Sequence, residues 1–221
     1  CMASTPSYNP NKIIQKPNKE YWDSILENEL SPLTYRCIQG LYAPGSTFKM
    51  VVAIAGIVNG VIDTNTKHFC NGKIGLGDRL YHCWKNNGHG SMNVSDAIKE
   101  SCDVFFYEIS KKIGIDKIAR VAEDFGLGKI YDIPLPNQKK GIIPSRDWKK
   151  KKYDESWYPG ETLISAIGQG FVLTNPLQLA VMTSIIASNG KNVKPNIINQ
   201  NNDIEFEKLE KYQNAINIIK S

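Results

Sequence analysis

The most regular hydrophobic pattern in the chain begins at Thr47 and ends at Gly60. Apolar residues recur there with the period of an α-helix, at Phe48, Met50, Val51, Ile54, Ile57 and Val58. Pro44-Gly45 interrupts the chain just before this run, and Gly60 can end a helix. The pattern therefore predicts one buried helix.

Other segments also carry helical patterns. Asn93 to Asp96 offers N-cap residues for a helical pattern that continues through Ile98, Val104, Phe105, Ile109 and Ile113 to Gly114. A similar pattern runs from Asp116 to Phe125 before Gly126. Asn175-Pro176-Leu177-Gln178 has the sequence of a capping box with proline at the first helical position, and it predicts a helix that reaches Ser188. A short helix is expected within Tyr21–Leu30, and few strands are evident.

Residues 63–93 lack such a period and contain five glycines, at positions 72, 75, 77, 88 and 90. They predict an irregular loop, and a loop of this length needs something to hold it. The first twenty residues contain Pro6, Pro10 and Pro17 and are expected to be extended. The longest apolar run, Met50 to Val58, is far below the roughly 20 residues that span a bilayer. An export signal is not recognisable either, so any address outside the cytoplasm is expected to lie outside these residues.

The composition is that of a folded domain, with 41% hydrophobic and 22% charged residues in 221. The net charge of +5 is mild, and only four of the 27 cations are arginine, the residue that base readout favours, so nucleic-acid binding is not expected. The densest cluster, Lys139 to Lys152, holds seven cations around Asp147. It is interpreted as a solvated face or loop, with an anionic cell-wall polymer or lipid head group as the alternative ligand.

Ser46 and Lys49 lie three residues apart at the start of the predicted buried helix, so that both side chains project from one face of its first turn. A serine at a helix N-terminus and a lysine among apolar neighbours can act as nucleophile and base. A second Ser-x-x-Lys occurs at Ser188 to Lys191, but Gly190 is expected to end a helix there. Only the first pair has a context that suits catalysis.

Four segments of the chain together match the motifs of one enzyme family, in order: the opening Ser4-Thr5-Pro6-Ser7-Tyr8-Asn9-Pro10-Asn11, the segment Tyr42-Ala43-Pro44-Gly45-Ser46-Thr47-Phe48-Lys49, the motif Ser101-Cys102-Asp103 with Val104-Phe105-Phe106-Tyr107, and Ile167-Gly168-Gln169-Gly170 with Thr174, Pro176 and Gln178. Through these segments the chain resembles the penicillin-binding transpeptidases, in particular the penicillin-binding protein 2 type of class B, in which the second segment carries the active serine and Ser101-Cys102-Asp103 is the second motif. The resemblance covers nearly the whole chain. It implies an α+β, serine β-lactamase-like fold in which a helical subdomain packs on an antiparallel sheet.

The resemblance also implies the chemistry. Ser46 would attack a D-alanyl-D-alanine stem peptide of peptidoglycan to form an acyl-enzyme, with Lys49 as base. Ser101 would relay a proton, Asp103 would orient Lys49 or the substrate where most relatives have Asn, and Gln169 and Gly170 would bind substrate. β-Lactam antibiotics would acylate Ser46. The whole protein would face the periplasm from the bacterial inner membrane, beside a glycan-polymerising membrane partner in cell elongation.

Cys70, Cys83, His89 and Cys102 suggest a metal site, because three thiolates and an imidazole complete a tetrahedral zinc shell. Their 12, 5 and 12 intervening residues lack a Cys-x-x-Cys pair, so a Cys70–Cys83 disulfide and buried free thiols remain alternatives. The resemblance adds Cys83-Trp84 and Gly88-His89-Gly90, since some relatives hold zinc there. His68 and His82 are possible substitute ligands, and Cys1 and Cys37 are left over.

The family's third motif, Lys-Thr-Gly or Lys-Ser-Gly, is absent, because Lys220-Ser221 ends the sequence without a glycine. The chain is thus expected to be a partial transpeptidase domain over 1–221, truncated before the C-terminal sheet strands and weak or inactive alone. Its expected parts are the active-serine segment and helix (42–60), the Cys/His-rich loop (63–93), the helical subdomain (93–126) and the Gly-Gln-Gly segment with its helix (160–190). The alternatives are a β-lactamase or β-lactam sensor of the same fold, and an inactive, zinc-stapled structural module.

Overall fold

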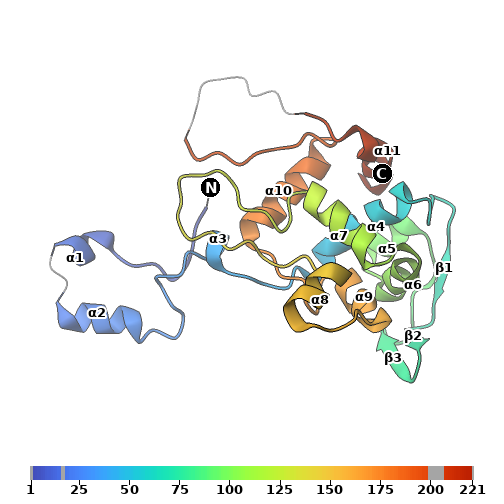
Figure 1. Ribbon diagram of the computed structural model, residues 1–221, viewed down its shortest axis with the longest axis horizontal. Coiled ribbons are helices and arrows are strands. Elements are labelled where there is room, and N and C mark those ends of the chain that lie inside the picture. Colours follow the sequence, from blue (N-terminus) through green and yellow to red (C-terminus); the bar gives the residue numbers. More distant parts are fainter. Residues whose placement is uncertain (1, 16–17, 199–206, 221) are drawn as a thin grey trace.

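The computed structural model describes residues 2–15, 18–198 and 207–220. Eleven α-helices and four short strands are found in these ranges, and Figure 1 shows their arrangement. The α-helices are α1 (Pro10–Ile14), α2 (Lys19–Leu26), α3 (Arg36–Gln39), α4 (Lys49–Val58), α5 (Val94–Lys99), α6 (Asp103–Ile113), α7 (Ile115–Asp124), α8 (Arg146–Tyr153), α9 (Pro159–Ala166), α10 (Pro176–Ala187) and α11 (Gln213–Lys220). The strands are β1 (His68–Cys70), β2 (Lys73–Leu76), β3 (Arg79–His82) and β4 (Gly90–Met92), and the 3₁₀ turns are η1 (Gly45–Phe48) and η2 (Glu210–Tyr212).

Helix α4 is the centre of the core, as the hydrophobic pattern predicts. Val51, Val52, Ala53, Ile54 and Ala55 have no exposed surface, and α5, α6, α7 and α11 pack around the helix. Burial of this many apolar side chains is the main stabilising term of such a fold. The 3₁₀ turn η1 leads directly into α4 and carries Ser46 on the surface of the core.

The predicted helix beginning at Asn93 is interrupted. Asn93 caps α5 through its side chain, which accepts from the Asp96 N–H, but the helix ends at Lys99 and α6 starts at Asp103. Ser101, between them, has φ of +52°, a left-handed conformation that costs a non-glycine residue about 1 kcal/mol. The hydrophobic pattern continues across this break, which is why it predicts one helix where the chain forms two.

Residues 63–93 are more regular than the sequence suggests. β1 pairs antiparallel with β4, and β2 pairs antiparallel with β3; both two-stranded sheets pack against α6. Gly72 and Gly88 have positive φ, and a Cβ on Gly88 would overlap the Cys70 carbonyl. The two glycines therefore allow backbone segments to approach closely where the ends of β1 and β3 meet.

Two smaller predictions near the C-terminal half need correction. The capping box at Asn175 is half formed: the Asn175 side chain accepts from the Gln178 N–H, but the buried Gln178 amide donates instead to the carbonyls of Lys129 and Lys140. In the Lys139–Lys152 cluster, Lys149 is only 2% exposed and lies 2.6 Å from Glu161 Oε1. A carboxylate partner makes its burial tolerable, whereas the neighbouring lysines of α8 are solvated as predicted.

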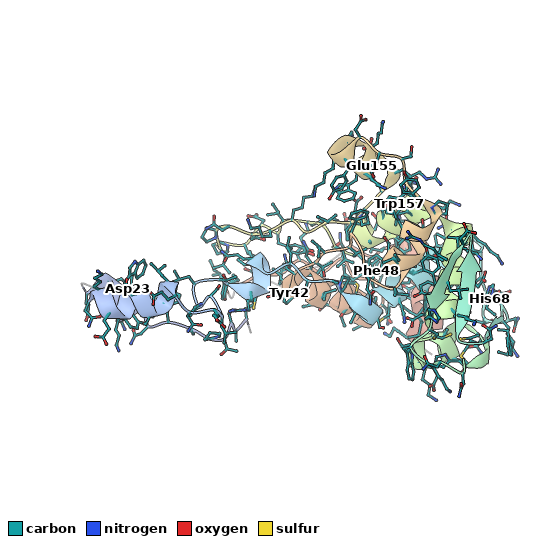
Figure 2. All side chains as sticks on the ribbon, turned by 90° about the horizontal axis from the view of Figure 1, so that it is seen from below. Asp23, Tyr42, Phe48, His68, Glu155 and Trp157 are labelled. Atoms are coloured by element: carbon teal, nitrogen blue, oxygen red, sulfur yellow. The ribbon has the colours of Figure 1, made fainter. Side chains whose placement is uncertain are left out.

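The N-terminal helices α1 and α2 stand apart at one side of the molecule (Figure 1), and Asp23 of α2 lies far from Phe48 and His68 in the perpendicular view of Figure 2. The helix predicted within Tyr21–Leu30 corresponds to α2, which starts two residues earlier, at Lys19, and ends at Leu26. Within the described residues, no helix is sufficiently long and apolar to cross a membrane.

Candidate active site and candidate metal centre

Four polar side chains meet at the start of α4 and the break between α5 and α6. Ser46 Oγ lies 2.8 Å from Ser101 Oγ, and Lys49 Nζ lies 2.9 Å from Ser101 Oγ and 2.6 Å from Asp103 Oδ1. Lys49 Nζ also donates to the Ser101 carbonyl at 2.9 Å. The structure therefore brings together all four residues that the sequence nominated as catalytic. The hydroxyl of Ser101 stands between the nucleophile candidate and the amine.

The break at Ser101 explains this geometry. The left-handed residue turns the chain so that Asp103 becomes the first residue of α6, while the Ser101 carbonyl remains outside both helices and accepts from Lys49. A continuous helix would use that carbonyl internally. Lys49 is 2% exposed and contacts the face of Phe106 as well, with Nζ 5.6 Å from the ring centroid.

A cleft of about 700 Å³ opens onto Ser46. Its lining includes Gln169, one of the two residues nominated for substrate binding, but not Gly170. The other lining residues are Gly45, His82, Cys83, Trp84, Ser101, Asp103, Tyr107 and Ile167. The sequence patterns assign no role in the cleft to Trp84 or Tyr107. For Trp84, its position directly after the predicted metal ligand Cys83 is the sequence feature that points to the site. Burial, with Asp103 adding to it, raises the pKa of the Tyr107 hydroxyl well above its ordinary value, so this residue stays protonated near neutral pH.

The Gly-Gln-Gly segment is attached to the active-serine segment through the backbone. The Gly45 N–H donates to the Gly168 carbonyl at 2.9 Å, and Tyr42 and Thr174 exchange hydrogen bonds of 2.8 and 2.9 Å. A Cβ on Gly168 would overlap the backbone of Gly45. Glycine is thus required at 168 for Gln169 to reach the cleft.

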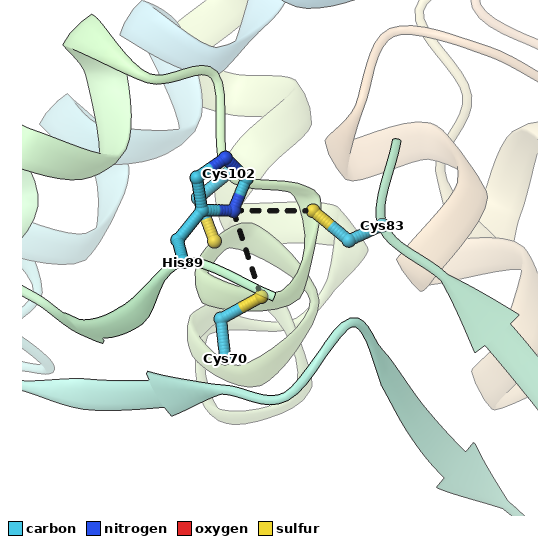
Figure 3. Close-up of side chains that lie close together, drawn as sticks. All are labelled: Cys70, Cys83, His89 and Cys102. Carbon is cyan, nitrogen blue, oxygen red and sulfur yellow. Dashed lines mark hydrogen bonds between the residues drawn. The ribbon is translucent and has the colours of Figure 1, made fainter. Parts of the chain in front are cut away.

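Cys70, Cys83, His89 and Cys102 form the Cys/His cluster shown in Figure 3. Their ligand atoms all lie within 4.8 Å of one another, and His89 Nδ1 is 3.6 Å from Cys70 Sγ and 3.5 Å from Cys83 Sγ. All described cysteines are free, so the alternative Cys70–Cys83 disulfide is not formed here. The cluster joins β1, the end of β3, the loop before β4 and the break before α6.

The chemistry of the Cys/His cluster fits a soft or borderline divalent metal. Burial, reinforced by Lys85, lowers the pKa of His89 and favours the neutral imidazole that binds metals. Burial raises the pKa of the Cys102 thiol to about 12, so a thiolate there requires a cation beside it. His68 and His82 are not part of the cluster: the His68 ring lies against Phe105, and the His82 carbonyl accepts from Tyr107.

The remaining cysteines lie elsewhere or outside the description. Cys37 Sγ faces the Ala3 carbonyl at 3.1 Å, remote from the Cys/His cluster in sequence, and Cys1 is outside the described residues.

Comparison with known proteins shows the family of the chain. Over residues 1–221 the chain matches the family described as the penicillin binding protein transpeptidase domain, and it belongs to that family. Among curated proteins, a peptidoglycan D,D-transpeptidase MrdA of Acinetobacter baumannii is 37% identical over 200 residues, covering 90% of this chain and 30% of the relative. The chain therefore spans about a third of that relative's length.

Solved structures give the same result for the fold. Penicillin-binding protein PBP2 of Helicobacter pylori matches with a TM-score of 0.92 and 33% identity, over 98% of this chain and 41% of that one. A structure described as "Structural coordination of polymerization and crosslinking by a peptidoglycan synthase complex" matches with a TM-score of 0.84 and 32% identity, over 98% of this chain and 39% of that one. The similarity to penicillin-binding protein 2 and the α+β transpeptidase fold predicted from the sequence are confirmed.

Proposed function

We propose that this chain carries the acylation machinery of a peptidoglycan D,D-transpeptidase. The observation that carries the proposal is the chain of short contacts from Ser46 Oγ to Ser101 Oγ and on to Lys49 Nζ. Ser46 is the nucleophile, Lys49 the base and Ser101 the hydroxyl between them. The base is the neutral form of the amine, which keeps two N–H groups for Asp103 Oδ1 and the Ser101 carbonyl and turns its lone pair to Ser101 Oγ. The Ser101 hydroxyl gives its proton to this lone pair and takes the proton of Ser46, so the proton passes to the amine through Ser101.

The reaction is two successive acyl transfers. Ser46 Oγ attacks the carbonyl carbon of the penultimate D-alanine of a stem peptide, the peptide C–N bond breaks, and the leaving D-alanine takes the proton through Ser101. An amine of a neighbouring stem then attacks the resulting ester, which forms the cross-link and returns the proton to Ser46. Asp103 holds Lys49 in position, and Gln169 lies on the cleft wall where the substrate amide must pass.

The same proposal extends to the inhibitors, the partner and the location of the whole protein. A penicillin-binding family name supports covalent inhibition by β-lactams at Ser46, and the match to a peptidoglycan synthase complex supports a glycan-polymerising membrane partner. Peptidoglycan lies outside the cytoplasmic membrane, so the site would work at the periplasmic face of the inner membrane. Residues 1–221 then form a part of the transpeptidase domain.

We further propose that the Cys/His cluster binds zinc. Four protein ligands would fill every position around a zinc ion and leave none open to substrate, which suits a structural rather than a catalytic role. Three buried thiols beside one imidazole, all within 4.8 Å, support this assignment. The zinc would stabilise residues 63–93 by linking β1 and the end of β3 to Cys102, the residue between Ser101 and Asp103.

Labelling by a fluorescent penicillin tests the transpeptidase proposal. The whole native protein that contains this chain should be labelled, Ser46→Ala should abolish labelling, and the control Ser188→Ala, from the second Ser-x-x-Lys, should be labelled normally. Labelling that survives Ser46→Ala would refute the assignment of the nucleophile. Release of the label within seconds would favour the β-lactamase alternative, and slow release the transpeptidase.

A second experiment compares penicillin labelling of residues 1–221 alone with labelling of the whole protein. Residues 1–221 alone should be labelled more slowly than the whole protein, because the sequence contains no Lys-Thr-Gly or Lys-Ser-Gly. Equal rates would show that the third motif is not needed for acylation. No labelling of the whole protein would favour the inactive structural module.

A further inference from the structure

Trp84 is an unusual residue for its position, because 62% of its surface is exposed although it is large and apolar. This indole, however, donates from Nε1 to two main-chain carbonyls, those of Glu100 and Ser101, each at 3.1 Å. Its orientation is therefore set by hydrogen bonds rather than by burial.

The carbonyls that accept from Trp84 belong to the break between α5 and α6. The last carbonyls of a helix have no partners within it and need donors from elsewhere. The Ser101 carbonyl depends on such donors, because the left-handed backbone of Ser101 places it outside both helices. Its carbonyl is held on one side by Lys49 Nζ and on the other by the Trp84 indole.

The main chain of Trp84 makes a second contact with the same segment. Its N–H donates to Asp103 Oδ2 at 3.0 Å, while Asp103 Oδ1 receives Lys49. Both carboxylate oxygens are thus used, one by Lys49 and one by Trp84. This fixes the rotation of the carboxylate plane.

The Cys/His cluster joins the same two segments next to these contacts. Cys83 precedes Trp84, Cys102 separates Ser101 from Asp103, and the Trp84 ring lies edge-on to His89 with centroids 5.3 Å apart. Residues 83–84 and 100–103 are therefore connected at the cluster, at the indole and at the main-chain N–H. We infer that Trp84 is a positioning residue, which transmits the order of the Cys/His cluster to Ser101 and Asp103 and so holds the proton path from Ser46 to Lys49. This inference rests on the proposed function.

Trp84→Phe in the whole native protein tests the inference, because phenylalanine keeps an aromatic ring beside His89 but lacks the indole N–H. The matched control is Trp157→Phe, which removes an indole that donates to Thr162 Oγ1 at 2.8 Å, away from the cleft lining. The measurement is acylation by a fluorescent penicillin, separated into the dissociation constant and the first-order acylation rate, together with zinc content.

Trp84→Phe should lower the first-order acylation rate by about tenfold, the effect of one hydrogen bond. The dissociation constant should stay within twofold of the wild type and the zinc content should be unchanged, and Trp157→Phe should match the wild type in all three. An unchanged acylation rate, or an equal loss in Trp157→Phe, would overturn the inference. So would a loss confined to the dissociation constant, which would make Trp84 a ligand contact, or a loss of zinc, which would place the effect in the cluster itself.

A spectroscopic readout separates this inference from the proposed function. In ¹⁵N-tryptophan-labelled protein, the indole signal that disappears in Trp84→Phe should be protected from hydrogen exchange despite the exposure of the ring. Absence of labelling in the wild type would refute the proposed function. An unprotected Trp84 indole in a protein that is acylated would refute the positioning contact alone.

Discussion

Lys49 and Asp103 form an ion pair of 2.6 Å in which Lys49 is 2% and Asp103 13% exposed. The two residues are 54 positions apart and belong to different helices, α4 and α6. Pairs that are buried to this degree are costly to break, because the remaining charge loses its partner without regaining water. The pair therefore ties the geometry of the active-serine segment to that of the second motif.

Asp103→Asn and Asp103→Ala should differ in both activity and stability. Asparagine has one carbonyl oxygen, so when this oxygen accepts from Lys49 the amide NH₂ takes the place of Oδ2 opposite the Trp84 N–H, and that hydrogen bond is lost. Acylation should then slow by about tenfold. Alanine leaves Lys49 without a carboxylate, so the free energy of unfolding should fall by about 3 kcal/mol, and acylation by about 100-fold or more. Penicillin labelling rates and urea denaturation measure these effects. Equal stability of the alanine variant and the wild type would contradict the role given to the pair.

Ser101→Gly and Ser101→Ala should separate the hydroxyl from the backbone. Both variants lose the Oγ between Ser46 and Lys49, so both should acylate about 100-fold or more slowly. Glycine tolerates a φ of +52° and alanine does not, so the glycine variant should be the more stable by about 0.5–1 kcal/mol. Denaturant unfolding of the glycine and alanine variants measures this difference in stability. A more stable alanine variant would mean that the left-handed turn at 101 is not retained.

Cys102→Ala should lose zinc whereas Cys37→Ala should keep it. Cys102 is a member of the Cys/His cluster, and Cys37 is a free cysteine outside it, so the two variants remove the same chemical group. Metal analysis of protein purified without chelator should give about one zinc per chain for the wild type and for Cys37→Ala. A zinc content near zero in the wild type would reject the site.

Asp124 should make stability dependent on pH. Burial would raise the pKa of Asp124, but hydrogen bonds from Lys211 and Tyr212 outweigh it and hold the pKa below its ordinary value. The stabilisation should then be fully present above the unfolded pKa of about 3.9 and be lost as the pH falls through the lower, folded value. Asp124→Asn should cost about 1 kcal/mol at pH 7.

The control for this prediction is Asp147→Asn, which removes an exposed ion pair with Lys151. Its effect should stay within about 0.5 kcal/mol. Thermal unfolding from pH 7 down to pH 2 measures both variants. A cost of Asp124→Asn that does not shrink below pH 4 would exclude the carboxylate as its source.

Local sequence patterns predict much of this fold. The apolar run with helical period from Phe48 gives α4, the asparagine at 175 gives the start of α10, and the spacing of Ser46 and Lys49 gives the first half of the candidate site. These features depend on periodicity and on capping, which are written in neighbouring residues. The four strands between residues 68 and 92 are three or four residues long, too short to show alternation, so the sequence pattern predicts a loop there.

Features that depend on distant partners could not be predicted from these patterns. The break at Ser101 leaves the apolar positions of α5 and α6 in phase, and its stabilising partners, Lys49 and Trp84, come from other segments. Lys149 belongs to a cationic run that is otherwise solvated, and it is buried because Glu161 of α9 lies beside it. In both cases tertiary contacts decide the conformation of a locally ambiguous sequence.

The active-serine segment is held by backbone hydrogen bonds to residues that are synthesised much later. Tyr42 bonds to Thr174, which is 132 residues later, and Gly45 bonds to Gly168, which is 123 residues later. Because a chain emerges from the ribosome N-terminus first, Ser46 is made long before the segment that completes its surroundings. Pairings of such separation also form slowly. Nascent chains that end before Thr174 should therefore be insensitive to penicillin.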